Sequence, residues 1–240
     1  MRVIFAGSPE PAVPVLRALV ASHHEVVLVV TREDRPRGRS KTPVPTPVGA
    51  VAHELGIPTL KPASINAPES LQVLRNADAG VLAVAAFGQI LRDDVLDGWP
   101  CINVHYSLLP AYRGAAPVER ALMDCAAHMG TTIMQMDAGL DTGPIIESVV
   151  LEVTGDDDAG SVLQKMAEAS GPALVRALDA VDAGTLVATP QTGAGSSVAA
   201  KITDADRLID PSRPARELVG QVRALSPHIG AVLHLSLIHI

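Results

Sequence analysis

Short apolar runs, typical of buried strands, alternate with longer segments of helical period from the start of the chain to about residue 183. The pattern predicts strands over 2–7, 25–31, 79–86, 101–106, 130–136 and 144–153, and helices over 11–22, 48–56, 66–76, 115–125 and 159–183. Strands that alternate with helices pair mostly in parallel, and helices then cover both faces of the sheet. The sequence therefore predicts a Rossmann-like α/β domain, whose ligands bind beyond the carboxyl ends of the strands.

Composition narrows the class of protein further. The 240 residues are 48% hydrophobic but only 2% aromatic, so Ala, Val, Leu and Ile must build the core. A net charge of −7 argues against a wholly basic nucleic-acid binder. Two cysteines do not make a disulfide framework. The apolar run at the start of the chain is too short to be the apolar part of a signal peptide. The longest nearly uncharged run, 79–91, is too short to span a membrane, so we expect a cytoplasmic protein.

The predicted strand at 101–106 carries two side chains suited to catalysis. Asn103 and His105 are two residues apart and therefore point to the same face of the strand. A Gly-rich turn after the next strand holds Asp137 and Asp141, and both His105 and Asp137 are expected at carboxyl ends of strands. An amide, an imidazole and a carboxylate together are able to run acyl transfer, with the amide and imidazole stabilising an oxyanion. The structural alternative is that these side chains cap turns or satisfy local hydrogen bonds.

Two loops bear on the substrate. The turn "GSPEPA" after the first strand lacks Gly-x-Gly-x-x-Gly, which disfavours a dinucleotide-binding oxidoreductase. The long loop over 32–47 carries five cations against two anions, a local charge of +3 in an acidic protein. Such a loop is either a solvated surface segment or a phosphate-binding one, and its length favours a function. Its cations are Arg32, Arg35, Arg37, Arg39 and Lys41.

Three motifs then resemble one family. "INVHYSLLPAYRGAAPVERAL", "GTTIMQMDAGLDTGPI" and "TREDRPRGRSKTPVPTPV" are similar to segments of the formyltransferases that use 10-formyltetrahydrofolate, in particular those that act on tRNA. The resemblance extends over about residues 1–234. Tyr106, where the family mostly has a small residue or another aromatic, and Pro211, where a Trp is common, depart from the pattern without touching the expected chemistry.

The resemblance implies a reaction and a role for each matching residue. The formyl group of 10-formyltetrahydrofolate, as co-substrate, would pass to the α-amino group of methionyl initiator tRNA, for translation initiation. Asn103 and His105 would stabilise the oxyanion, and Asp141 would orient His105 and help to remove the amine proton. No metal is expected, because a formyl group on an aniline-like nitrogen is already activated. Asp137 stays open between a structural and a catalytic role, with the structural one favoured.

Binding residues follow from the same resemblance. It assigns folate contacts to Ser107, Leu108, Leu109, Pro110, Phe87, Gly88 and Gln89, and tRNA contacts to Arg35, Arg37, Arg39 and Lys41. It implies a monomer whose partners are folate and initiator tRNA, with no membrane. The alternatives are a formyltransferase of the same fold that acts on a nucleotide sugar or purine precursor, and a non-catalytic folate-binding or tRNA-binding module.

The C-terminal part is expected to be organised differently. The resemblance and composition together predict a catalytic domain over 1–188, a linker over 189–207, and the first part of an OB-like tRNA-binding domain over 208–234. A helix with Leu218, Val222 and Leu225 on one stripe would need a partner surface there. The final segment, 235–240, reads as a non-native tail, which predicts a C-terminally truncated chain.

Overall fold

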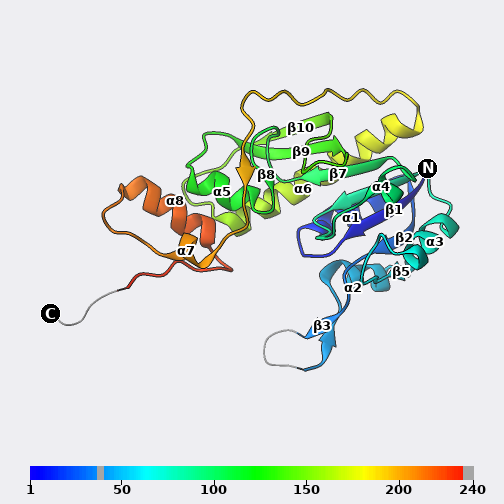
Figure 1. Cartoon of the computed structure of the whole chain (residues 1–240), viewed down its shortest axis with the longest axis horizontal. Helices are drawn as coiled ribbons and strands as arrows, with labels where there is room; N and C mark the ends of the chain where they lie inside the picture. The colour runs from blue at the N-terminus through cyan, green and yellow to red at the C-terminus, as the bar shows by residue number, and fades with distance from the viewer. Residues whose placement is uncertain (37–40, 235–240) are drawn as a thin grey trace.

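The computed structural model describes residues 1–36 and 41–234, and a seven-stranded sheet forms its centre (Figure 1). Every pair of neighbouring strands is parallel except the two pairs that β9 forms with β7 and β10. The prediction of a mostly parallel sheet is therefore confirmed. In spatial order the strands are β10 (Ile145–Leu151), β9 (Met129–Gln135), β7 (Cys101–His105), β6 (Val81–Ala85), β1 (Arg2–Gly7), β2 (Glu25–Val30) and β5 (Thr59–Leu60).

Helices cover both faces of the sheet, and the alternation along β1 shows how the core divides. Val3 and Phe5 belong to the larger core, whereas Ile4 and Ala6 face the smaller one. Each set is fully buried, because side chains of a strand alternate between faces. The larger core is covered by α1 (Ala12–Val20), α2 (Pro47–Glu54), α5 (Pro117–Met123) and α6 (Ala159–Asp182), and the smaller one by α3 (Pro68–Asn76) and α4 (Asp93–Leu96).

The longest helix, α6, begins and packs for identifiable reasons. The Asp158 carboxylate accepts a hydrogen bond from the Ser161 backbone N–H, and the Ser161 hydroxyl contacts the Asp158 N–H, which is a capping box. In the middle of the helix, a Cβ at Gly171 would lie 2.5 Å from the Cβ of Ala18 on α1. The absence of a side chain at 171 therefore lets α1 and α6 approach closely and fixes both helices on the same face.

The order of the strands determines where a ligand site can form. The chain runs from β1 outward to β2 and β5, and then returns to the other side of β1 as β6, β7, β9 and β10. The connections therefore diverge between β1 and β6, which leaves a crevice at the carboxyl ends of these strands. His105 ends β7 and Asp137 follows the end of β9, as expected from the sequence. Because β9 is antiparallel, however, its carboxyl end lies beside Cys101 at the start of β7 and not beside His105.

The long basic loop contains structure that its sequence did not predict. Its described parts form a two-stranded antiparallel ribbon of β3 (Arg35–Pro36) and β4 (Pro43–Val44). Figure 1 shows this ribbon projecting from the domain next to α2. The side chain of Thr46 accepts a hydrogen bond from the Gly49 N–H at 3.0 Å and so begins α2. Arg37 and Arg39 lie outside the described residues.

The segment expected to be a linker is docked onto the domain. It contributes β11 (Val198–Ala199), which pairs in parallel with β8 (Arg113–Gly114). Beyond it, α7 (Asp204–Arg207) is tied to α5 by Asp206, whose carboxylate accepts hydrogen bonds of 2.6 and 3.0 Å from the Arg120 guanidinium. The Arg120 guanidinium keeps the pKa of the Asp206 carboxyl well below its ordinary value.

The predicted amphipathic helix forms α8 (Ala215–Leu225) and packs against α5. A Cβ at Gly220 would lie 2.7 Å from the Leu122 carbonyl oxygen, so this glycine permits the close approach. The buried residues of α8 are Gly220, Gln221, Ala224 and Leu225. Val222, from the expected apolar stripe, is exposed instead, because two residues correspond to about 200° around a helix and place it opposite Gly220. The tail at 235–240 lies outside the described residues. No described helix is long and apolar enough to cross a membrane.

Candidate active site

A cavity of about 550 Å³ opens at the carboxyl ends of β6 and β7. It contains all three residues that the sequence predicted for catalysis, Asn103, His105 and Asp141. The first two come from β7, and the third comes from the loop between β9 and β10. Apolar residues of the three neighbouring strands and their loops form much of the remaining wall, including Val84, Ala86, Phe87, Ile90, Met134, Met136 and Leu140.

The period of β7 explains why two polar side chains reach the cavity. Cys101, Asn103 and His105 share one face of the strand, and Cys101 lies in the smaller core. Burial raises the pKa of the Cys101 thiol to about 12, so this group stays protonated and is not a nucleophile. Asn103 and His105, further along the same face, emerge where the cavity begins.

Asn103 is almost buried, yet its amide is available to a ligand. The residue is 9% exposed and lies between Val84 on β6 and Met134 on β9. Within the described part of the chain, its side chain has no hydrogen-bond partner. The amide is not among the described side-chain atoms that are both fully buried and unpartnered, so it opens into the cavity. Its position on the cavity wall makes a bound molecule the natural partner.

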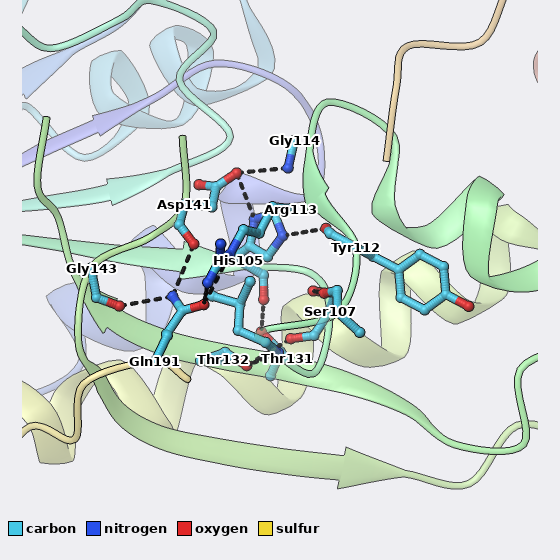
Figure 2. A network of polar contacts seen from close by, with 12 residues as sticks. His105, Ser107, Tyr112, Arg113, Gly114, Thr131, Thr132, Asp141, Gly143 and Gln191 are labelled. Atoms are coloured by element: carbon cyan, nitrogen blue, oxygen red, sulfur yellow. Dashed lines mark hydrogen bonds and ion pairs between the residues drawn. The ribbon is translucent and has the colours of Figure 1, made fainter. Parts of the chain in front are cut away.

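His105 is held on both sides of its ring (Figure 2). Its Nε2 lies 2.8 Å from the carbonyl oxygen of Tyr112, and its Nδ1 lies 3.7 Å from Oδ2 of Asp141. A carbonyl oxygen only accepts, so Nε2 carries a proton and donates it to Tyr112. The Nδ1 atom faces the carboxylate at a separation longer than a hydrogen bond. The wider spacing at Nδ1 leaves that atom accessible to a ligand.

Asp141 lies in a tight turn that brings its carboxylate back to β7. Its Oδ2 accepts a hydrogen bond of 2.8 Å from the Gly114 N–H, and its φ of 51° is in the left-handed region. The turn has no room for side chains at its glycines, since a Cβ at Gly143 would lie 1.9 Å from the Gln135 carbonyl oxygen. The loop therefore compensates for the antiparallel direction of β9, whose end alone does not reach His105.

Asp137 stabilises the start of the same turn. Its Oδ1 accepts hydrogen bonds from the Gly139 N–H at 3.0 Å and from the Thr142 hydroxyl at 2.7 Å. These contacts are those of an Asx turn, in which a carboxylate satisfies nearby backbone and side-chain donors. The structural interpretation of Asp137, which the sequence favoured, fits this geometry.

The residues expected to bind folate divide into two groups. Phe87, Gly88 and Gln89 all line the cavity, whereas Ser107, Leu108, Leu109 and Pro110 are not among the described residues that line it. Ser107 and Leu108 instead border a separate cavity of about 50 Å³. The backbone N–H of Leu109 donates to the Thr132 hydroxyl at 3.1 Å, so this segment forms a fixed turn beyond β7.

Of the residues expected to bind tRNA, Arg35 is exposed on β3 and Lys41 is exposed shortly before β4, whereas Arg37 and Arg39 are not described. An unexpected ion pair increases the local positive character. The carboxylate of Asp34 accepts from the ammonium of Lys61 at 2.7 and 2.8 Å, so one of the two acidic groups of the loop is already neutralised. Arg32 at the base of the loop lies beside Gly88, which is on the cavity wall.

Two residues of this region were missed by sequence reasoning. Gln191 donates through Nε2 to the carbonyl oxygens of Asp141 and Gly143, at 2.9 and 2.8 Å. Its Oε1 accepts from the guanidinium of Arg113 at 3.0 and 2.6 Å (Figure 2). Arg113 belongs to a motif that the sequence singled out, but Gln191 lies in a low-complexity segment that carried no signal. Only the tertiary structure brings it to the site.

Known proteins resemble this chain in sequence. Residues 1–178 match the family described as "Formyl transferase". The chain is 44% identical over 229 residues to the methionyl-tRNA formyltransferase of Chromohalobacter salexigens. The aligned residues cover 95% of this chain and 70% of that protein. It is 41% identical over 235 residues to the enzyme of the same name from Acidothermus cellulolyticus, covering 96% of this chain and 72% of that one.

Solved structures share the fold at low identity. A 4-N formyltransferase from Francisella tularensis aligns with a TM-score of 0.75 and 16% identity, covering 97% of this chain and 91% of that one. Glycinamide ribonucleotide transformylase 1 from Symbiobacterium toebii aligns with a TM-score of 0.64 and 20% identity, covering 80% of this chain and 94% of that one. At these identities the likeness concerns the fold.

Proposed function

The chain belongs to the formyl transferase family, and on this premise we propose that it moves the formyl group of 10-formyltetrahydrofolate to the α-amino group of methionyl initiator tRNA. The observation that carries the proposal is the meeting of Asn103, His105 and Asp141 at one cavity. An unpartnered amide, an imidazole facing a carboxylate and a wall of apolar side chains are the groups that acyl transfer from a folate requires. Relatives more than 40% identical that carry the name methionyl-tRNA formyltransferase support the choice of acceptor.

The reaction follows from the positions of these three groups. The methionine nitrogen attacks the formyl carbon, a C–N bond forms, and the carbonyl electrons move to oxygen. The Asn103 amide and the Nδ1–H of His105 donate to that oxyanion, since Nε2 is committed to Tyr112. Asp141 balances the charge of the imidazolium and accepts a proton from the methionine nitrogen, which becomes positively charged once its bond to the formyl carbon has formed, directly or through water. The bond to the folate nitrogen then breaks, and that nitrogen is reprotonated to give tetrahydrofolate.

The donor occupies the apolar part of the cavity in this proposal. Ile90 and Leu140 line it and are 82% and 63% exposed, so they offer apolar surface at its rim to a flat ring system. Phe87 and Gly88 form the wall next to them. The side chain of Gln89 is turned away, because it accepts from Ile65 N–H and donates to the Pro62 carbonyl. Gln89 thus contributes through its backbone. Residues 107–110, also expected to bind folate, form the turn beyond β7 and would contact only a part of the donor that extends past the cavity.

The acceptor is recognised by the basic loop and not by the donor cavity. Arg35 on β3 and Lys41 shortly before β4 are exposed, and with Arg37 and Arg39 they form the phosphate-binding set. Arg32, beside Gly88, links this set to the edge of the cavity. Residues 1–188 form the catalytic domain, residues 189–207 connect it to the part from 208 onward, and the protein acts as a cytoplasmic monomer.

One experiment tests the reaction and the acceptor together. The protein is incubated with 10-formyltetrahydrofolate and either methionyl initiator tRNA, methionyl elongator tRNA or an amino sugar linked to a nucleotide. We expect formyl-methionine on the initiator tRNA and none on the sugar. Transfer to the sugar without transfer to tRNA would replace this proposal with the sugar-modifying alternative.

A further inference from the structure

The two residues that hold His105 both have a strained backbone. Tyr112, whose carbonyl accepts from Nε2, has a φ of 59°, and Asp141, whose carboxylate faces Nδ1, has a φ of 51°. Residues other than glycine rarely adopt the left-handed region, and they persist there only when their surroundings hold them. Whatever holds these two backbones therefore sets the orientation of the imidazole.

Both backbones are held by one segment, 189–199, which we call the strap. Gln191 of the strap donates to the carbonyl of Asp141 itself and to that of Gly143. Ser197 of the strap accepts from the Tyr112 N–H through its hydroxyl, at 2.9 Å. The contacts thus reach the two strained residues directly, one on each side of His105.

Backbone pairing anchors the two ends of the strap. Thr189 exchanges two hydrogen bonds of 2.8 and 2.7 Å with Ile145, the first residue of β10. At the other end, β11 pairs with β8, and a Cβ at Gly114 would lie 2.9 Å from the Ala199 carbonyl oxygen. Gly114 is also the donor to Asp141 Oδ2. The strap therefore lies against both the loop that presents Asp141 and the turn that presents Tyr112 and Gly114.

Gln191 connects the loop that presents Asp141 with the turn that presents Tyr112 and Gly114. Its amide group donates to the Asp141 loop, while its oxygen accepts from Arg113, between Tyr112 and Gly114. A glutamine side chain is suited to this because it has donors and an acceptor on one planar group. A leucine at 191 would keep none of these contacts, and a lysine would keep only those in which the side chain donates.

We propose that Gln191 is a positioning residue for formyl transfer. Its side chain connects two segments: the turn whose Tyr112 carbonyl accepts from His105 Nε2, and the loop whose Asp141 carboxylate faces His105 Nδ1. This inference rests on the proposed function. It assigns a role in the reaction to a segment outside the family match, which ends at residue 178. Misplacing a catalytic group by about 1 Å lowers turnover by roughly 100-fold, so a remote hydrogen bond is sufficient to matter.

The test uses the full chain with Gln191→Glu, which keeps the length and the acceptor for Arg113 but removes the amide donor. Ser197→Ala removes the other contact, and Thr192→Ala, at an exposed strap residue, is the matched control. We expect Gln191→Glu to lower kcat by about 10-fold to 100-fold, with the KM for 10-formyltetrahydrofolate nearly unchanged. Ser197→Ala has a smaller effect of the same kind, and Thr192→Ala has none.

A second readout does not depend on turnover. In protein labelled with ¹⁵N-histidine, the ring signals of His105 are identified by their loss in His105→Gln. They should move in Gln191→Glu and stay in Thr192→Ala, while the melting temperature changes little. Unchanged kcat and unchanged His105 signals in Gln191→Glu overturn the proposal, as does an equal loss of folate affinity and thermal stability. If the wild type transfers no formyl group, formyl transfer itself fails, and the His105 signals still decide the role of Gln191.

Discussion

Replacing Asn103 by Ala separates catalysis from stability more cleanly than any other change at this site. The amide is 9% exposed and has no hydrogen-bond partner among the described residues, so its removal breaks no protein hydrogen bond. We therefore expect the free energy of unfolding to change by less than about 1 kcal/mol. Loss of one oxyanion donor should nevertheless slow transfer by about 10²–10³-fold, or about 2.7–4 kcal/mol in the activation free energy.

The assay for this prediction is single-turnover formylation of methionyl initiator tRNA at saturating donor, followed by gel separation of the formylated product. Denaturant unfolding of the same variant measures its stability, and Asn76→Ala, at an exposed residue of α3, is the matched control. A rate within about 3-fold of the wild type would refute oxyanion donation by Asn103, because a true donor contributes far more. A large loss of stability would instead show that the amide has a structural partner.

Three further predictions concern the loop, the turn and a buried histidine. Arg39→Ala should raise the KM for tRNA and leave the KM for the donor unchanged. The slope of the logarithm of tRNA affinity against the logarithm of salt concentration should become less steep by about one unit. Gly143→Ala should lower the free energy of unfolding by roughly 1–3 kcal/mol, because the added methyl would overlap the Gln135 carbonyl. Burial, with His23 adding to it, lowers the pKa of His24 below 6.5. Since the unfolded chain then binds the proton more readily, the free energy of unfolding should fall as the pH drops below about 6.5.

Each of these has a matched control. Arg75→Ala on α3 should not affect tRNA, and an equal loss of donor binding in Arg39→Ala would indicate a misfolded domain. Gly155→Ala, where a Cβ meets nothing within 4 Å, should leave stability unchanged; a similar loss there would remove the steric argument at 143. His24→Gln should flatten the dependence of stability on pH between 7 and 5, whereas exposed His53→Gln should not. Identical slopes for wild type and His24→Gln would contradict the argument from burial.

The amino-acid sequence by itself determined the α/β class, the strands of the sheet other than β5, its helices other than α4, and the identity of the residues that meet at the cavity. These properties are local. The period of the apolar residues distinguishes strands from helices, and the two-residue spacing of Asn103 and His105 puts both on one face. Long motifs around Asn103 and Asp141 carried the family resemblance for the same reason, since a motif is itself a local pattern.

The direction of β9, the docking of 189–199 and the packing of α8 were decided only by the tertiary structure. The side chains of a strand alternate in the same way whether it pairs in parallel or antiparallel. The sequence therefore does not show that β9 runs against β7 and ends beside the start of that strand. The strap is held by single polar contacts such as that of Gln191 to the Asp141 carbonyl, and these leave no apolar period. This contact joins groups that are 50 residues apart in the sequence, which is why the geometry of His105 and Asp141 emerges only when the chain has folded.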